Sequence, residues 1–219
     1  MSKIKCIIFD YDGVLVDSEE ISNQVLISMA KQYGLEMTLE QAIRNFNGRS
    51  LKDCLQQIEE KIKKRLPDNF VNEYREKSFI AFKTDLKPVK GVRDFIDNLK
   101  ISYCVASSGP VEKITLNLTT TGMFDKFKNK IFSSYQINSW KPDPDIFLFA
   151  ANKMGFSISE CVVVEDSLAG VISATKGGFK VFGFAKESNS QELIDEGATV
   201  FYNFNELAKL LNEEEMNNS

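Results

Sequence analysis

Two carboxylates one residue apart, Asp10 and Asp12, directly follow a short apolar run at residues 6–9. That run predicts a buried strand, and Gly13 then allows the chain to turn sharply. In an α/β protein, ligands bind at the carboxyl ends of parallel strands. Two acids at such an edge repel each other, and a divalent cation would offset the repulsion. Taken alone, the pair is explained equally well as the cap of a turn.

Further polar groups occupy the same kind of position, at the end of an apolar strand or in the loop that follows it. They are Ser107, Lys141, Glu165 and Asp166. Three or four carboxylates form an oxygen cage suited to Mg²⁺. Backbone N–H groups beside Ser107 lead into a predicted helix and suit a phosphate, and Lys141 adds a positive charge for a phosphoryl oxygen. The topology of a parallel sheet would bring all of these groups to one edge.

This set of groups has the chemistry for phosphoryl transfer. One carboxylate would attack phosphorus and form an aspartyl-phosphate, and the second acid of the pair would move the proton. Each group alone has a plainer explanation: Ser107 as a helix cap, Lys141 as a solvated loop residue, and Glu165 with Asp166 as a turn. Their joint occurrence in this order favours the functional interpretation.

The sequence contains no histidine. A Ser-His-Asp or Cys-His device and a His-ligated metal site are therefore excluded. The four cysteines show no CxxC pair, and Cys6, Cys104 and Cys161 lie inside apolar runs. We expect them to be small buried hydrophobic side chains in a reducing compartment.

The bulk composition is that of an ordinary globular protein. The 219 residues are 43% hydrophobic and 26% charged, which suits one core domain with an inserted module. The net charge of −4, with scattered Lys and Arg, argues against a nucleic-acid partner. No signal peptide or membrane span is recognised. We expect a cytoplasmic monomer.

Residues 18–86 have helical periodicity and no convincing strand, which predicts four consecutive helices. Thr38 and Gln41 have the spacing of a capping box. Gly34 is placed as the cap that ends the first helix. The stripe expected to be buried on this helix consists of Ile21, Val25, Met29 and Tyr33.

Strands and helices alternate from Pro88 onward, which predicts a doubly wound parallel sheet of the α/β class. Asp143 is predicted to cap a helix that begins at Pro144, and the tail after Asn212 is expected to fray. The resulting domains are a Rossmann-like core, residues 1–16 and 87–219, and a helical cap, residues 17–86.

The motifs in this order resemble those of the haloacid dehalogenase superfamily of phosphohydrolases. The chain is similar to the β-phosphoglucomutase-like branch, which carries a helical cap after the first strand. The resemblance covers residues 5 to about 185. The motifs read Phe9-Asp10-Tyr11-Asp12-Gly13-Val14, Val105-Ala106-Ser107-Ser108-Gly109, Trp140-Lys141-Pro142-Asp143-Pro144 and Val164-Glu165-Asp166-Ser167.

The resemblance implies a role for each motif. Asp10 would be the nucleophile that accepts the phosphoryl group, and Asp12 would be the general acid and base that also gives Mg²⁺ its backbone carbonyl. Ser107 and Lys141 would hold the phosphoryl group. Asp166, helped by Glu165, would complete the metal site.

The resemblance also implies where the substrate is selected. Gly48 and Arg49 lie in a loop between two cap helices, where similar proteins contact the leaving group, although an exposed Arg near a helix start is an equally good explanation. Ser108 and Gly109, in the stretch that runs to Lys113, flank the phosphate loop and are expected to face the substrate. A small phosphate ester, either a sugar phosphate or a sugar-acid phosphate, is the expected substrate.

Several alternatives remain open at this stage. A phosphosugar mutase of the same branch would carry a histidine at the position of Ser22, so its absence favours hydrolysis. A carbon–halogen hydrolase would lack the second acid, Asp12. A receiver-type signalling module would be shorter, without a helical insertion, and would place its acceptor after the third strand. A catalytically silent interaction protein would not need intact motifs.

Overall fold

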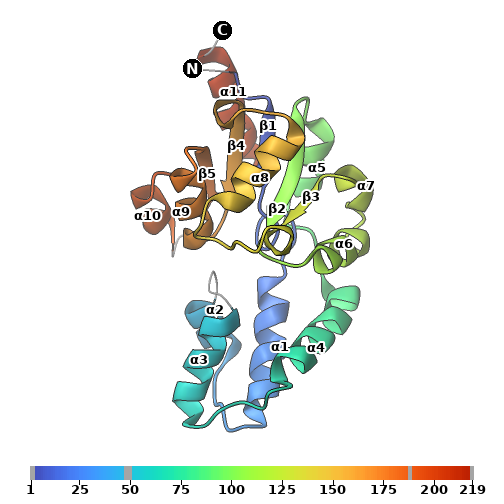
Figure 1. Ribbon diagram of the computed structural model, residues 1–219, viewed down its shortest axis with the longest axis vertical. Helices are drawn as coiled ribbons and strands as arrows, with labels where there is room; N and C mark the ends of the chain where they lie inside the picture. Colours follow the sequence, from blue (N-terminus) through green and yellow to red (C-terminus); the bar gives the residue numbers. More distant parts are fainter. Residues whose placement is uncertain (1–2, 47–50, 187–188, 218–219) are drawn as a thin grey trace. The chain divides into compact units, whose positions relative to one another are not determined.

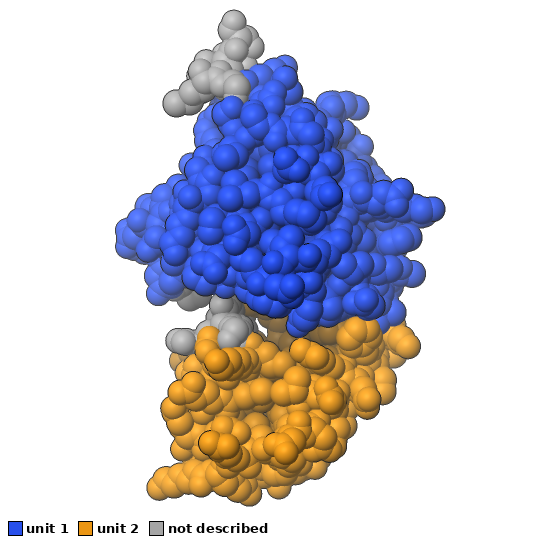
Figure 2. All heavy atoms as spheres, viewed as in Figure 1, with its two compact units in different colours: residues 1–16, 88–219 blue, residues 17–87 orange. Residues whose placement is uncertain are grey.

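The computed structural model describes residues 3–46, 51–186 and 189–217, and the chain divides into two compact units (Figure 2). The first unit comprises residues 1–16 and 88–219, and the second comprises residues 17–87. Compared with the predicted division, Lys87 falls in the second unit rather than in the core.

A six-stranded sheet forms the centre of the first unit, with the order β3-β2-β1-β4-β5-β6 (Figure 1). All five pairings are parallel, which confirms the predicted doubly wound sheet. The chain builds outward from β1 to β3 and then returns to β4, beside β1, so the topological switch point lies between these two strands. The strands are β1 Cys6–Phe9, β2 Ser102–Ser107, β3 Ile131–Ser133, β4 Cys161–Glu165, β5 Lys180–Phe184 and β6 Thr199–Phe201.

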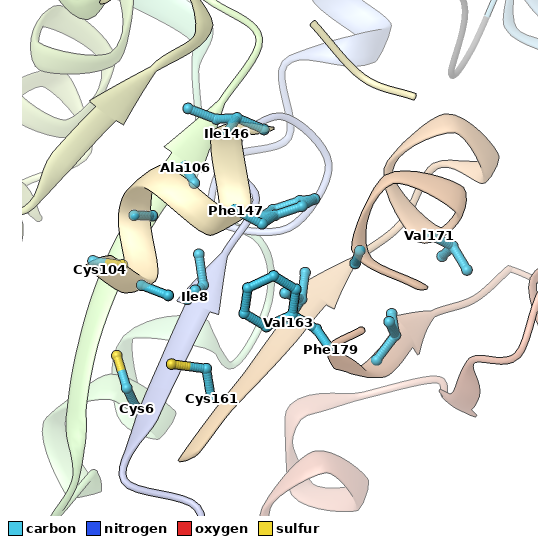
Figure 3. Close-up of a cluster of buried hydrophobic side chains, with 14 of the residues drawn as sticks. Cys6, Ile8, Cys104, Ala106, Ile146, Phe147, Cys161, Val163, Val171 and Phe179 are labelled. Carbon is cyan, nitrogen blue, oxygen red and sulfur yellow. The ribbon is translucent and has the colours of Figure 1, made fainter. Parts of the chain in front are cut away.

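Both faces of the sheet are covered, and the alternation of side chains along β1 shows how. Ile8 points to the face where Phe147 and Val171 pack, with Cys6 and the other two strand cysteines on the same side (Figure 3). Phe9 points to the opposite face, where its ring meets Phe95 at 6.2 Å between centroids. The helices of this unit are α5 Val92–Asn98, α6 Val111–Thr120, α7 Phe124–Phe127, α8 Asp145–Met154, α9 Leu168–Lys176, α10 Ser190–Asp195 and α11 Phe204–Asn217.

The second unit consists of helices around their own apolar core. The capping box is confirmed, because Gln41 N donates to Thr38 Oγ1 and Thr38 N donates to Gln41 Oε1. The predicted stripe on the first helix is confirmed in part, since Met29 is buried and Val25 and Tyr33 are partly buried against the same core. The buried residues of the helix also include Leu26 and Ala30. The helices are α1 Glu19–Lys31, α2 Leu39–Phe46, α3 Leu51–Ile62 and α4 Phe70–Asp85.

Two further expectations about helix ends are corrected. The cap of α1 is Gln32 rather than Gly34, which adopts a positive φ of 99° two residues later. The segment expected to fray after Asn212 continues α11 as far as Asn217. None of the helices in the described ranges has the length and apolarity needed to cross a membrane.

Candidate functional site

Three carboxylates meet at the switch point of the sheet. Asp10 directly follows β1, while Glu165 ends β4 and Asp166 follows it. One carboxylate oxygen from each residue lies within 4.8 Å of the others. The two strands are paired as far as Asp10, whose N–H donates to the carbonyl of Val164 at 2.8 Å. Because Asp10 is only 6% exposed and Glu165 only 1%, their charges need a positive partner inside the protein.

Lys141 supplies that partner. Its ammonium group donates to Asp10 and also to Oε1 of Glu165 at 2.7 Å. The Lys141 side chain is only 6% exposed, so this is a buried bridge between the two strand ends. The turn that presents Lys141 is closed by Asp143 N, which donates to Trp140 O at 3.0 Å. Ser173 on α9 donates to the Asp143 carbonyl at 2.7 Å and ties the turn to the helix.

The predicted start of α8 is one residue too early. Asp143 closes the preceding turn through its N–H, and the Lys141–Pro142 peptide bond in that turn is cis. Pro144 is the N-cap instead, and its carbonyl accepts from Phe147 N. The helix therefore begins at Asp145.

The buried charges shift the pKa values of the groups that carry them. Burial raises the pKa of Asp10 to about 7, and the neighbouring charge of Glu165 acts in the same direction, with Lys141 offsetting part of the rise. Burial alone would lower the pKa of Lys141, but the two carboxylates outweigh it and raise that pKa above its ordinary value. Lys141 is therefore fixed as a cation, whereas Asp10 needs further positive charge to ionise fully.

Two glycines allow the carboxylates to lie so close to the backbone. A Cβ on Gly13 would lie 2.0 Å from Oδ2 of Asp166, and the φ of +82° at Gly13 is itself unfavourable for other residues. A Cβ on Gly170 would lie 1.7 Å from Oε1 of Glu165. Ser167, the N-cap of α9, donates its N–H to Oε2 of Glu165 at 2.8 Å. The first turn of α9 thus holds Glu165 in one orientation.

Asp12 has a partner of its own. Lys113, on α6, donates to Oδ1 of Asp12 at 2.9 Å and to Oδ2 at 2.8 Å. The two side chains remain 21% and 32% exposed respectively, so this pair is far less buried than the one made by Lys141. Asp10 and Asp12 therefore lie in different environments, and each pairs with a different lysine.

Ser107 lies at the end of β2, the neighbour of β1, and its side chain is buried. Its Oγ accepts from the N–H of Gly109 at 3.0 Å, and the Gly109 carbonyl accepts from Ser133 Oγ at 2.6 Å. The N-cap of α6 is Pro110, so the alternative interpretation of Ser107 as the cap of that helix is wrong. Ser108 lies half-buried in the same tight loop.

The structure thus brings together most of the predicted groups. Asp10, Glu165, Asp166 and Lys141 form one contact network. Gly48 and Arg49 lie outside the described residues. The contacts of Lys113 with Asp12 and of Ser167 with Glu165 were not predicted. Ser167 had a signal, because a Ser that begins a helix after an acidic pair is a natural N-cap. Lys113 ends the stretch expected to flank the phosphate loop, but its spacing does not indicate a pairing with Asp12.

The cluster has the chemistry of a divalent cation site. Its donors are hard carboxylate oxygens, which suit Mg²⁺, and its single buried ammonium group leaves an excess of negative charge. The same edge of the sheet carries a tight loop with a serine hydroxyl and backbone N–H groups, which suits an anion. A cation site beside an anion site is what the transfer of a phosphoryl group requires.

Comparison with known proteins agrees with this arrangement. Residues 7–184 match the family described as haloacid dehalogenase-like hydrolase. The 6-phosphogluconate phosphatase of Escherichia coli K12 is 29% identical over 96% of both chains. A phosphorylated carbohydrates phosphatase of Thermotoga maritima is 28% identical and covers 96% of this chain and 99% of its own.

A solved structure also shows the similarity to this family. A haloacid dehalogenase-like protein of unknown function from Agrobacterium tumefaciens has a TM-score of 0.87 and 30% identity, covering 96% of this chain and 98% of its own. With the family match spanning most of the chain and the sheet, the carboxylates and Lys141 in place, the predicted resemblance is confirmed. The chain belongs to the haloacid dehalogenase-like hydrolase family.

Proposed function

We propose that the protein is a Mg²⁺-dependent phosphatase that hydrolyses a small phosphorylated metabolite, a sugar phosphate or a sugar-acid phosphate, through an aspartyl-phosphate on Asp10. The observation that carries the proposal is the buried network in which Lys141 joins Asp10 to Glu165 beside the oxygens of Asp166. The activities named for the two similar phosphatases from Escherichia coli and Thermotoga maritima support the class of substrate.

The residues divide the work according to their positions. Asp10 attacks phosphorus through a carboxylate oxygen, and the bond from phosphorus to the leaving alcohol breaks. Asp12 gives a proton to the departing oxygen and later takes one from the water that attacks the aspartyl-phosphate. Ser107, the backbone N–H groups of its loop and Lys141 bind the phosphoryl oxygens and offset their charge. Free phosphate and the regenerated Asp10 carboxylate are the products.

Asp10, Asp166 and the backbone carbonyl of Asp12 would hold Mg²⁺, with Glu165 in support. The bound ion would reduce the repulsion between the Asp10 carboxylate and an anionic substrate. Burial and the charge of Glu165 raise the pKa of Asp10, and such a cation would lower it and keep the carboxylate ionised.

Hydrolysis is preferred to a phosphosugar mutase because a mutase must orient a sugar and deprotonate the hydroxyl group that attacks the phosphoenzyme. The chain offers no histidine for that task, and Ser22 has too weak an acid–base group to replace one. Water is then the acceptor. The remaining proposals are that the protein acts as a cytoplasmic monomer and has no nucleic-acid or membrane partner.

The proposal is tested with purified protein and p-nitrophenyl phosphate, followed by a panel of sugar phosphates and sugar-acid phosphates. We expect release of phosphate with MgCl₂ and none after dialysis into excess EDTA, with recovery when Mg²⁺ is restored. Equal activity in EDTA would contradict the metal requirement. Absence of turnover across the panel would contradict the phosphatase assignment.

A further inference from the structure

We propose that Lys113 is a positioning residue that holds the carboxylate of Asp12 for the hydrolysis of the phosphoenzyme. The inference rests on the proposed function and adds a residue that the family motifs of this chain do not include. It is carried by the ion pair that Lys113 makes across 101 positions of sequence with both oxygens of Asp12.

The geometry of the pair fixes the carboxylate in space. A single ammonium group that contacts both oxygens, at 2.9 and 2.8 Å, favours one orientation of the carboxylate plane. The backbone of Lys113 is fixed because this residue lies near the start of α6, the helix that follows the Ser107 loop. Its ammonium group also lies 5.9 Å from the centre of the ring of Tyr11, a residue that is fully buried.

The pair leaves Asp12 able to act on water. Each carboxylate oxygen has two acceptor positions, and Lys113 uses one on each. The Asp12 side chain is 32% exposed, whereas that of Asp10 is 9% exposed, so Asp12 is the more accessible of the two side chains to water. An oriented and accessible carboxylate is what a general base for water requires.

The charges of the site give a second reason for Lys113. The formal charge of the site is −2, summed over four acids and two lysines, and one divalent cation neutralises it. These residues are Asp10, Asp12, Glu165, Asp166, Lys113 and Lys141. Without Lys113 the formal charge would be −3, and a dianionic substrate would meet an excess of negative charge. The ion pair therefore both orients Asp12 and compensates its charge.

The step that Lys113 assists is the hydrolysis of the aspartyl-phosphate. Water attacks the phosphorus of the aspartyl-phosphate, its proton passes to the Asp12 carboxylate, and the bond between phosphorus and the Asp10 oxygen breaks. The electron pair of that bond returns to Asp10 as a carboxylate. The proton on Asp12 is then released or given to the next leaving alcohol. Lys113 forms no bond to the reacting atoms and acts only through Asp12.

The test compares Lys113→Met with Lys113→Arg, which keeps the charge and the ability to contact two oxygens. p-Nitrophenolate leaves readily without a general acid, so formation of the phosphoenzyme from p-nitrophenyl phosphate should survive in Lys113→Met. Its hydrolysis should slow by about 10- to 100-fold. We expect a burst of about one equivalent of p-nitrophenolate and then a slow steady state, with the phosphoryl adduct visible by mass spectrometry after acid quenching. Lys113→Arg should recover much of the steady-state rate.

A matched control is Lys126→Met, which removes another Lys–Asp pair, that with Asp97, without touching Asp12. It should leave the steady-state rate unchanged. A Lys113→Met protein with unchanged steady-state kinetics, or with loss of burst and steady state together, would overturn the positioning role. If the unmodified protein shows no Mg²⁺-dependent turnover, the proposed function itself fails, and this outcome is distinct from a failure of the Lys113 assignment.

Discussion

Gly170 and Glu165 lie so close together that a Cβ on the glycine would be 1.7 Å from the carboxylate oxygen that accepts from Lys141. Gly170→Ala should therefore displace Glu165 and disturb its bond to Lys141. We expect activity to fall at least about tenfold, with a loss of stability of about 1–3 kcal/mol from overpacking. Steady-state kinetics and chemical denaturation measure the two effects. Leu168→Ala, an exposed change in the same turn, should alter neither by much, and wild-type behaviour of Gly170→Ala would contradict the close approach.

Asp10→Asn should abolish turnover, by about a thousandfold or more, because the amide does not attack phosphorus as a carboxylate does. The fold should persist, since asparagine has nearly the same shape and can still accept a hydrogen bond from Lys141. Kinetics together with circular dichroism check this. Substantial activity in a folded Asp10→Asn protein would remove Asp10 as the nucleophile.

Lys141→Met should be strongly destabilising as well as inactive. It would leave Asp10 and Glu165 buried beside each other without their ammonium partner, at a cost of about 3–5 kcal/mol at pH 8. Protonation of the carboxylates would relieve the repulsion, so the loss should shrink as the pH falls. Urea denaturation at pH 8 and pH 5 measures the difference. A loss that is the same at both pH values would contradict the buried bridge.

The pKa of Asp10 predicts how the metal-free protein responds to pH. Its folded-state pKa of about 7 lies above the ordinary value, so the stabilisation from the protonated form is fully present below about pH 4 and is lost as the pH rises through 7. Mg²⁺ must displace that proton, so its affinity should rise over the same range. We expect MgCl₂ to raise the melting temperature more at pH 8 than at pH 5.5.

Asp10→Asn provides the control for this titration, because it removes the group that takes up the proton. The difference between the Mg²⁺-induced shifts at the two pH values should decrease in this variant. An equal stabilisation of the unmodified protein by Mg²⁺ at both pH values would contradict the raised pKa of Asp10.

The missing histidine predicts the fate of a sugar phosphate that enters the site. Incubation with β-glucose 1-phosphate should give glucose and phosphate, and little glucose 6-phosphate, because no cap-side histidine is present to assist transfer back to the sugar. ³¹P nuclear magnetic resonance distinguishes free phosphate from glucose 6-phosphate. Isomerisation at a rate comparable to hydrolysis would restore the mutase interpretation.

The fold and the acidic cluster were predictable because both depend on local patterns. The apolar runs before Asp10 and Glu165 specify strands, and parallel strands place their carboxyl ends at one edge. The start of α8 was placed one residue too early, since its N-cap is Pro144 rather than Asp143. Ser173 donates to the Asp143 carbonyl, which is a tertiary contact that local spacing does not reveal. The apolar stripe predicted for α1 was incomplete because packing also buries Leu26 and Ala30, which the chosen spacing left out.

The pairing of Lys113 with Asp12 was not predictable for a different reason. The stretch that runs to Lys113 was expected to flank the phosphate loop, but nothing in the residues near Lys113 indicates Asp12 as its partner. Its role depends on how α6 lies against the end of β1, which a separation of 101 residues does not reveal. The same holds for Gly170, whose function is visible only when the position of the Glu165 carboxylate is known.

The position of β1 in the sheet also determines how often the backbone that carries Asp10 opens by local unfolding. β1 is paired on both sides, with β2 and β4, and all four of its residues are buried. Such a strand exchanges its amide hydrogens slowly and opens only when much of the domain unfolds. Asp10 is attached directly to this strand, so the proposed nucleophile sits on some of the least mobile backbone in the unit. Its alignment should then persist for nearly as long as the domain remains folded.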